Sequence, residues 1–217
     1  ARTAASLRHA NVASVLHLGR TKGSYFYAME FVEGETLESL IKRSGRLAPK
    51  LALEIAAQVA SGLAAVQKKG LVHRDIKPTN VMVSLEEGGA VTAKIIDLGL
   101  AKAVSEPGSQ TTISLPGVFA GTPQFASPEQ LAGADVDIRS DLYSLGVTLW
   151  EMLMGKAAPF RGSSADAMYQ HQRVCLPVEQ LRGVPQPLVV LLEVLLEKDP
   201  ARRFQSPAEL LKVMPMV

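Results

Sequence analysis

The sequence lacks several features that would assign it to a particular class of protein. Its one cysteine, Cys175, cannot form a disulfide within the chain, which favours a reducing, cytoplasmic location. No apolar run approaches the roughly 20 residues of a membrane-spanning helix, so we expect no membrane segment. The formal net charge is only +2, which argues against nucleic acid as a partner. With 47% hydrophobic and 20% charged residues, the composition is that of a globular protein.

Metal chemistry based on histidine has no support either. His9, His17 and His171 have no further ligand-type residue at a useful spacing. We interpret His73 as a packed core imidazole. No metal site is therefore assigned to histidine.

The first part of the chain has β-like runs interrupted by turns. Residues 1–9 read as the end of a helix, and residues 12–18 and 25–31 as the two strands of a hairpin. Thr36 is expected to cap a short helix that ends at Arg43. This pattern predicts a small β-rich unit at the start of the chain.

A long helix and short strands follow. Pro49 opens a helix that ends at Gly70 and carries one apolar stripe, formed by Ile55, Val59, Leu63 and Val66. Residues 71–72, 81–85 and 91–96 read as short strands. Together they place a few strands in the middle of a helical sequence.

From residue 128 onward the pattern is helical, after a long stretch at 103–124 that reads as a functional or mobile loop. Ser206 and Glu209 form a predicted capping box around Pro207. Two apolar stripes are present, one of Leu142, Leu145, Leu149 and Met152, the other of Leu188, Leu191, Leu192, Leu195 and Leu196. The whole pattern predicts an α+β fold with a mostly helical body.

The strongest chemical signal is the run from His73 to Asn80, with the sequence HRDIKPTN. A loop held between two strands can present Asp75, Lys77 and Asn80 toward one point. An acid, a cation and an amide that converge suit phosphoryl transfer, because that reaction needs a positioned nucleophile and neutralised phosphate charge. The alternative is a charged surface loop with a cap-like Asn.

A second signal is Asp97, which follows an apolar strand and precedes Leu98 and Gly99. Alone, an Asp-Leu-Gly sequence is an ordinary strand-end turn. Its distance along the chain from Asp75 and Asn80 favours a shared site instead.

These runs resemble the motifs of the eukaryotic-like Ser/Thr protein kinases, particularly the bacterial ones. His73 to Asn80 is similar to the catalytic loop, and Asp97 to Gly99 to the metal-binding Asp-Phe-Gly. Further resemblances lie at Gly121-Thr122-Pro123, at Ser127-Pro128-Glu129, at Asp141 to Gly146, and at Asp199-Pro200 with Arg203. The resemblance implies a protein-kinase-like fold, with residues 1–33 as a partial β N-lobe with the hinge and residues 34–217 as a helical C-lobe.

The resemblance also implies roles in ATP-dependent phosphorylation of Ser/Thr hydroxyls on protein substrates. Asp75 would orient or deprotonate the substrate hydroxyl, and Thr122 would help to seat it. Lys77 would meet the transferred phosphate and marks Ser/Thr rather than Tyr specificity. Asn80 and Asp97 would hold Mg²⁺.

The adenine of ATP is expected to lie against the strand at residues 25–32. Met29 would be the gatekeeper residue, and the backbones of Glu30 and Val32 would meet the adenine. Met82 would lie beneath the ring. Plain core packing is the alternative for Met29 and Met82.

Other motif residues are expected to stabilise the fold or to take part in regulation. Asp141 would accept backbone hydrogen bonds from the catalytic loop, and Glu129 would pair with Arg203 across 74 positions of sequence. Arg74 would receive a phosphorylated residue of the activation segment, with Ser109, Thr111, Thr112 and Ser114 as the candidates.

The sequence departs from the family mainly by what it does not contain. No G-x-G and no Val-Ala-x-Lys run occurs, so the Gly-rich loop and the strand lysine are missing. Because the chain does not begin with Met and its other motifs are intact, we expect a truncated kinase. Without the Gly-rich loop and the strand lysine, these residues alone are expected to bind ATP weakly, turn over negligibly and tend to associate. A small-molecule kinase of the aminoglycoside phosphotransferase type and a non-catalytic pseudokinase or scaffold are the competing interpretations.

Overall fold

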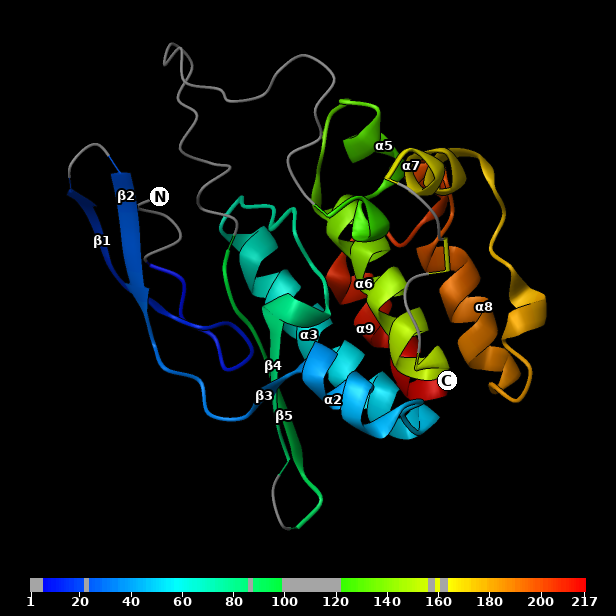
Figure 1. The fold of residues 1–217 in the computed structure, drawn as a ribbon, viewed down its shortest axis with the longest axis horizontal. Helices are drawn as coiled ribbons and strands as arrows, with labels where there is room; N and C mark the ends of the chain where they lie inside the picture. The colour runs from blue at the N-terminus through cyan, green and yellow to red at the C-terminus, as the bar shows by residue number, and fades with distance from the viewer. Residues whose placement is uncertain (1–5, 22–23, 86–87, 99–121, 156–158, 161–163) are drawn as a thin grey trace.

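A computed structural model describes residues 6–21, 24–85, 88–98, 122–155, 159–160 and 164–217 of the protein. Figure 1 shows a hairpin beside a helical body, with a second small sheet between them. The hairpin consists of β1 (Val15–Thr21) and β2 (Ser24–Met29), which pair antiparallel from Val15 opposite Met29 to Thr21 opposite Ser24. The predicted hairpin is therefore confirmed.

The segment before the hairpin corrects the helix expected at residues 1–9. Residues 1–5 lie outside the described part, and residues 6–9 form a turn and a bridge rather than a helix. The reason is that Val12 pairs in parallel with Ile95. Ile95 N donates to Asn11 O at 2.9 Å, and Ala13 N donates to Ile95 O at 2.8 Å. The backbone hydrogen bonds of this segment are thus satisfied by a strand far along the chain.

The second sheet has the order β3–β4–β5, with both pairs antiparallel. Its strands are β3 (Glu35–Thr36), β4 (Val81–Leu85) and β5 (Val91–Ile95). Alternate residues of β4 and β5 are buried, as expected for a sheet covered on one face. The strand predicted at residues 71–72 does not form, because Leu71 N instead donates to Val66 O at the end of the preceding helix.

The two helices that flank this sheet match the sequence pattern. Thr36 caps α2 (Leu37–Ser44) by accepting a hydrogen bond from Ser39 N at 3.2 Å. Pro49 stands at the start of α3 (Pro49–Lys68), and its predicted apolar stripe is buried. Gln58 fastens α3 to β5 by accepting from Ala93 N at 2.8 Å. It also donates to Val91 O at 2.7 Å.

Gly62 of α3 is needed where the helix crosses the segment before the hairpin. A Cβ at this position would lie 2.8 Å from Asn11 O and 2.9 Å from Ile95 Cδ1. Gly62→Ala is therefore expected to destabilise the domain by about 1–3 kcal/mol, the usual cost of overpacking. Hydrogen exchange of α3 amides measures the effect, with Gly88→Ala as control because a Cβ there meets nothing within 4 Å. Equal exchange in both variants would contradict this prediction.

The remaining helices surround α6 (Ile138–Met154), which lies in the middle of the helical body and contacts α3 and α8 (Figure 1). The stripe Leu142, Leu145, Leu149 and Met152 is fully buried. The helices around it are α5 (Pro128–Leu131), α7 (Ser164–Arg173), α8 (Gln186–Leu195) and α9 (Pro207–Val213). Short 3₁₀ turns η1 (Pro78–Asn80), η2 (Pro123–Phe125), η3 (Val178–Gln180), η4 (Pro200–Arg202) and η5 (Met214–Met216) join the elements.

Only half of the capping box predicted before α9 forms. Ser206 accepts from Glu209 N at 3.1 Å, but the Glu209 carboxylate accepts from Gln205 N at 2.7 Å instead of from Ser206 N. The Ser206 hydroxyl thus satisfies one of the first N–H groups of the helix.

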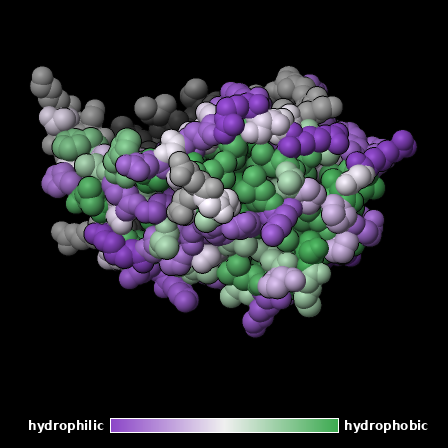
Figure 2. All heavy atoms as spheres, turned by 90° about the horizontal axis from the view of Figure 1, so that it is seen from below, coloured by the Kyte–Doolittle hydropathy of each residue, from purple (hydrophilic) through white to green (hydrophobic). Residues whose placement is uncertain are grey.

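The surface shown in Figure 2 carries polar side chains over much of its area, with an apolar area near its centre. Among the helices of the described residues, none is both long and apolar enough to span a membrane.

Candidate active site

One buried carboxylate holds the loop from His73 to Asn80 in place. Asp141, in the first turn of α6, accepts from His73 N and from Arg74 N, both at 2.7 Å. Arg74 has a φ of 66°, a conformation that costs a non-glycine residue about 1–3 kcal/mol. Burial raises the pKa of Asp141 to about 7, while the two backbone donors act in the opposite direction. The predicted backbone contacts of Asp141 are thus confirmed.

His73 joins this loop to the strand end that carries Asp97. The imidazole is buried, with Nδ1 accepting from Asp75 N at 3.3 Å and Nε2 lying 3.3 Å from Ile96 O. Because a carbonyl oxygen only accepts, Nε2 carries the hydrogen and the ring is neutral. The interpretation of His73 as a packed core residue agrees with this geometry.

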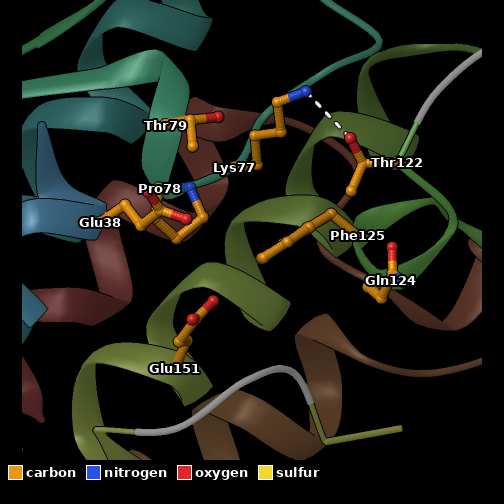
Figure 3. Close-up of a pocket in the computed structure, with 8 residues that line it drawn as sticks. All are labelled: Glu38, Lys77, Pro78, Thr79, Thr122, Gln124, Phe125 and Glu151. Carbon is orange, nitrogen blue, oxygen red and sulfur yellow. Dashed lines mark hydrogen bonds between the residues drawn. The ribbon is translucent and has the colours of Figure 1, made fainter. Parts of the chain in front are cut away.

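Four of the predicted site residues form one chain of contacts, of which Figure 3 shows the hydrogen bond between Lys77 and Thr122. Lys77 Nζ lies 2.9 Å from Asp75 Oδ2 and donates to Thr122 Oγ1 at 2.9 Å. Asn80 Nδ2 donates to Asp75 Oδ2 at 3.0 Å and to Asp75 O at 2.8 Å. The structure therefore brings together Asp75, Lys77, Asn80 and Thr122, although Thr122 is distant in the sequence.

Asp97 lies next to this cluster in space. Ile96 N donates to Asn80 O at 2.9 Å, so the backbone before Asp97 runs beside Asn80. Asp97 has a φ of 58°, and its Oδ1 accepts a hydrogen bond from the Tyr27 hydroxyl of β2. Burial and the Asp97 carboxylate raise the pKa of Tyr27 to about 12. Sequence reasoning missed Tyr27, because no motif marks it.

Asn80 and Asp97 have the chemistry that a magnesium ion requires. The amide nitrogen of Asn80 is turned toward Asp75, so its Oδ1 is the atom left for a ligand role. Asp97 supplies a carboxylate at the neighbouring strand end. Mg²⁺ takes oxygen ligands and is commonly held by one or two side chains together with substrate phosphates. The residues present fit such an ion.

A cavity of about 200 Å³ lies where adenine is expected. Val32 and Met82 line it, whereas Met29 and Glu30 are not among its lining residues. Met29 is half-buried at the end of β2, and Glu30 N donates to Ser14 O at 2.9 Å, so the Glu30 N–H is already used within the protein. The Glu30 carboxylate pairs with Lys94 and its pKa is lowered by that contact.

A larger cavity, of about 410 Å³, is lined in part by Lys77 and Thr122 (Figure 3). Glu38 of α2 and Glu151 of α6 line it, and sequence reasoning missed both. Glu151 Oε2 is buried and has no hydrogen-bond partner among the described residues. Burial and the neighbouring Glu38 raise the pKa of Glu151 to about 7, with Lys42 opposing.

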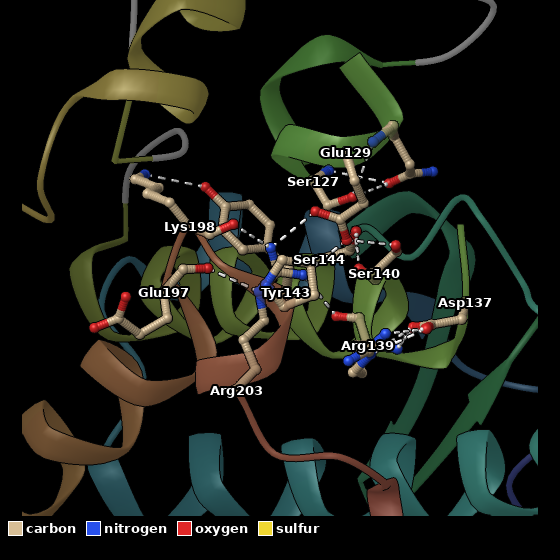
Figure 4. A network of polar contacts seen from close by, with 12 residues as sticks. Ser127, Glu129, Asp137, Arg139, Ser140, Tyr143, Ser144, Glu197, Lys198 and Arg203 are labelled. Atoms are coloured by element: carbon tan, nitrogen blue, oxygen red, sulfur yellow. Dashed lines mark hydrogen bonds and ion pairs between the residues drawn. The ribbon is translucent and has the colours of Figure 1, made fainter. Parts of the chain in front are cut away.

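The predicted pair of Glu129 and Arg203 is confirmed, and it is bidentate (Figure 4). Arg203 Nη1 and Nη2 each lie 2.8 Å from a different Glu129 oxygen. The Arg203 side chain is fully buried, and its remaining donors reach the carbonyls of Arg139, Glu197 and Lys198. The Arg203 contacts and the Ser140 hydroxyl lower the pKa of Glu129 against the effect of burial.

Glu129 is available for this pair because another residue completes the cap of α5. Ser127 accepts from Gln130 N at 3.4 Å, and Gln130 Oε1 accepts from Ser127 N at 3.0 Å. Gln130 Nε2 also donates to Arg74 O at 3.1 Å, which ties α5 to the catalytic loop. The Ser-Pro-Glu-Gln sequence was a readable signal for this capping box.

Several sequence predictions fall outside the described residues. They concern Gly99, Gly121 and the phosphorylation candidates Ser109, Thr111, Thr112 and Ser114. Leu98, at the position where the family usually has Phe, is buried.

Comparison with known proteins decides the family. Residues 1–214 match the family described as protein kinase domain. The chain belongs to the protein kinase family. It is 40% identical over 215 residues to the serine/threonine-protein kinase pkn2 of Myxococcus xanthus, which covers 97% of this chain and 25% of that protein. It is 35% identical over 217 residues to the serine/threonine-protein kinase PknB of Mycobacterium leprae, covering 97% of this chain and 34% of that protein.

The solved structures agree on the fold. A chain of Rad53 (residues 1–466, in complex with AMP-PNP) superposes with a TM-score of 0.81 at 23% identity, covering 100% of this chain and 53% of that chain. The predicted protein-kinase-like fold is confirmed. This kinase domain spans about a quarter to a third of the length of the curated bacterial relatives.

Proposed function

We propose that the protein transfers the γ-phosphate of ATP, with Mg²⁺, to Ser or Thr hydroxyls of protein substrates. The observation that carries this proposal is the position of Lys77, whose ammonium group contacts both Asp75 and Thr122. A carboxylate to orient the acceptor hydroxyl and a cation for the transferred phosphate then lie side by side. This reaction depends on positioning and on charge stabilisation rather than on covalent catalysis.

Each side chain has one task in this scheme. Asp75 accepts the hydrogen bond of the substrate hydroxyl and takes its proton as the new bond forms. Thr122 helps to position that hydroxyl, and Lys77 stabilises the negative charge of the phosphoryl group during transfer. Asn80 keeps Asp75 in place through its amide nitrogen.

Asn80 Oδ1 and the Asp97 carboxylate would hold Mg²⁺, which supplies charge neutralisation at the phosphates. On the adenine side, Val32 and Met82 line the cavity proposed for the base, and the backbones of Glu30 and Val32 would supply its polar contacts. Met29 would close the cavity from the end of β2. We further propose that residues 1–33 act as the upper lobe and hinge and residues 34–217 as the lower lobe. ATP supply fits the cytoplasmic location predicted from the sequence.

The cavity beside Lys77 and Thr122 suits the protein substrate. Its two carboxylates differ, because Glu38 pairs with Lys42 at 3.0 Å whereas Glu151 Oε2 has no partner among the described residues. A buried carboxylate without a donor is costly, and a lysine or arginine of the substrate would satisfy it. We therefore propose that peptides with a basic residue near the acceptor hydroxyl are favoured.

This preference is expected to depend on pH. Since the pKa of Glu151 is raised to about 7, the carboxyl group is neutral below that pH and charged above it. The KM of the full-length protein for a basic peptide should fall roughly tenfold between pH 6 and 8, the equivalent of about 1.4 kcal/mol. For a matched peptide with a neutral residue at that position, the KM is expected to change little between pH 6 and 8.

Glu151→Gln is expected to remove the difference between the two peptides while leaving kcat for the neutral peptide unchanged. Phosphoamino-acid analysis of the product tests the reaction itself, and Ser or Thr must carry the label. A wild-type protein that transfers no phosphate would support the scaffold interpretation. Transfer with equal KM for both peptides at pH 8 would refute only the acidic subsite.

A further inference from the structure

The turn that follows Thr122 accepts hydrogen bonds from side chains of two different helices. Thr122 is the residue before the 3₁₀ turn η2, and the carbonyls of Gln124 and Phe125 in that turn accept hydrogen bonds from other helices. His171 Nε2, from α7, lies 2.9 Å from Gln124 O. Ser144 Oγ, from α6, donates to Phe125 O at 2.7 Å. Two consecutive carbonyls are thus fixed independently.

The hydrogen-bond partners of His171 define its protonation. The imidazole is fully buried, and its Nδ1 lies 2.8 Å from the Tyr143 hydroxyl. Because the Gln124 carbonyl only accepts, Nε2 must carry a hydrogen, and in the neutral ring Nδ1 then accepts from Tyr143 O–H.

The surroundings disfavour a second proton on the ring. Lys198 Nζ lies 3.4 Å from the Tyr143 oxygen and 4.2 Å from the centroid of the Phe160 ring, so its positive charge faces the same pocket. Phe160 packs edge-on against His171, with ring centroids 4.8 Å apart. Burial, followed by the Lys198 charge, lowers the pKa of His171 to about 4, against the effect of the Gln124 carbonyl.

Gln124 connects this network to the substrate side of the site. It lines the cavity of about 410 Å³ together with Lys77, Thr122 and Glu151. His171 does not line that cavity and contacts none of the proposed catalytic groups in the hydrogen bonds of the described residues. The hydrogen bond to Gln124 O is therefore its direct connection to the turn that carries Thr122.

We propose that His171 is a positioning residue for the protein substrate. Its neutral imidazole couples α7 to the turn at Thr122–Phe125 and thereby sets the affinity for the acceptor peptide and not for ATP. This proposal rests on the proposed kinase function. It assigns a role to a histidine that the sequence pattern had left without one.

A merely structural histidine is the competing explanation, since the side chain also satisfies two buried polar groups. Two amide variants separate these explanations. His171→Gln places its amide nitrogen near the position of Nε2 and keeps a donor for Gln124 O. His171→Asn is shorter, so its amide stands near Nδ1 and keeps only the Tyr143 contact. A structural role predicts a loss of stability without a selective change in the KM for the peptide, whereas a positioning role raises that KM alone when the donor to the turn is lost.

The test is steady-state kinetics of the full-length protein with a Ser/Thr peptide. We expect His171→Asn to raise the KM for the peptide roughly tenfold, as for the loss of one buried hydrogen bond, with kcat and the KM for ATP within about twofold of wild type. His171→Gln should stay within about twofold in all three parameters. Gln172→Asn, a polar change at the next position of α7, is the matched control.

The outcomes are distinct. A wild-type protein without transfer to the peptide would overturn the proposed function and this proposal with it. Two results would overturn this proposal alone, provided that the wild-type protein transfers phosphate. One is an unchanged KM for the peptide in His171→Asn. The other is an equal increase of that KM in His171→Asn and His171→Gln. Imidazole ¹⁵N shifts of His171 in the wild type give a readout that needs no variant to fold. A neutral ring protonated at Nε2 is expected at pH 7, and a charged or Nδ1-protonated ring would overturn the proposal.

Discussion

Asp75→Asn in the full-length protein is expected to lower the rate of phosphate transfer by about 10²- to 10⁴-fold, the range for loss of a general acid–base group. The amide keeps an oxygen that can face Lys77 Nζ and Asn80 Nδ2, which lie 2.9 and 3.0 Å from Asp75 Oδ2. It cannot take the proton of the substrate hydroxyl. Binding of ATP should therefore remain while kcat is lost.

The matched control is Asp135→Asn, which makes the same chemical change at an exposed position. It should leave kcat and both KM values unchanged. Nucleotide affinity is measured by calorimetric titration on the same preparations, so that a folding defect in Asp75→Asn would be seen. An Asp75→Asn protein that keeps more than about a tenth of the wild-type rate would show that Asp75 is not the base.

Arg203→Met is expected to cause the largest loss of stability, about 3–5 kcal/mol, because it leaves the Glu129 carboxylate as a buried charge without its partner. Arg203 bridges the α5 segment, the start of α6 and the end of α8 through its contacts with Glu129 and with backbone carbonyls. Its guanidinium carbon also lies 4.8 Å from the centroid of the Tyr143 ring. A variant without it should loosen α5 and, through Gln130, the catalytic loop.

Hydrogen exchange of amides in α5 and α6 measures this effect in the full-length protein. Arg202→Met serves as control, because the neighbouring Arg202 is exposed. The double variant Glu129→Gln with Arg203→Met should recover part of the loss, since no buried charge remains. Equal protection in the Arg202 and Arg203 variants would contradict the clamp.

The sequence predicted the elements that depend on local signals. Thr36, Pro49 and Ser206 marked helix starts correctly, because caps and N1 prolines act within one turn of helix. The helix expected at residues 1–9 was wrong for residues 6–9. Residues 11–13, which follow directly, pair with Ile95, and a long-range bridge leaves no periodic trace in the sequence.

The candidate site divides in the same way. Asp75, Lys77, Asn80 and Asp97 stood out because a motif brings them close along the chain or in a familiar order. The acidic lining from Glu38 and Glu151 and the bond of His171 to Gln124 depend on which helices pack together. Such tertiary placements became visible only in the structure. Tyr27, which contacts Asp97 from another strand, is a further case.

The position of the divalent ion tests the central claim most directly. Crystals of the full-length protein grown with Mn²⁺ and a non-hydrolysable ATP analogue would show the ion by its anomalous scattering. The predicted result is a peak between Asn80 Oδ1 and the Asp97 carboxylate, with the terminal phosphate facing Lys77 and Asp75. A bound nucleotide whose metal ion contacts neither Asn80 nor Asp97 would contradict the proposed phosphoryl-transfer site.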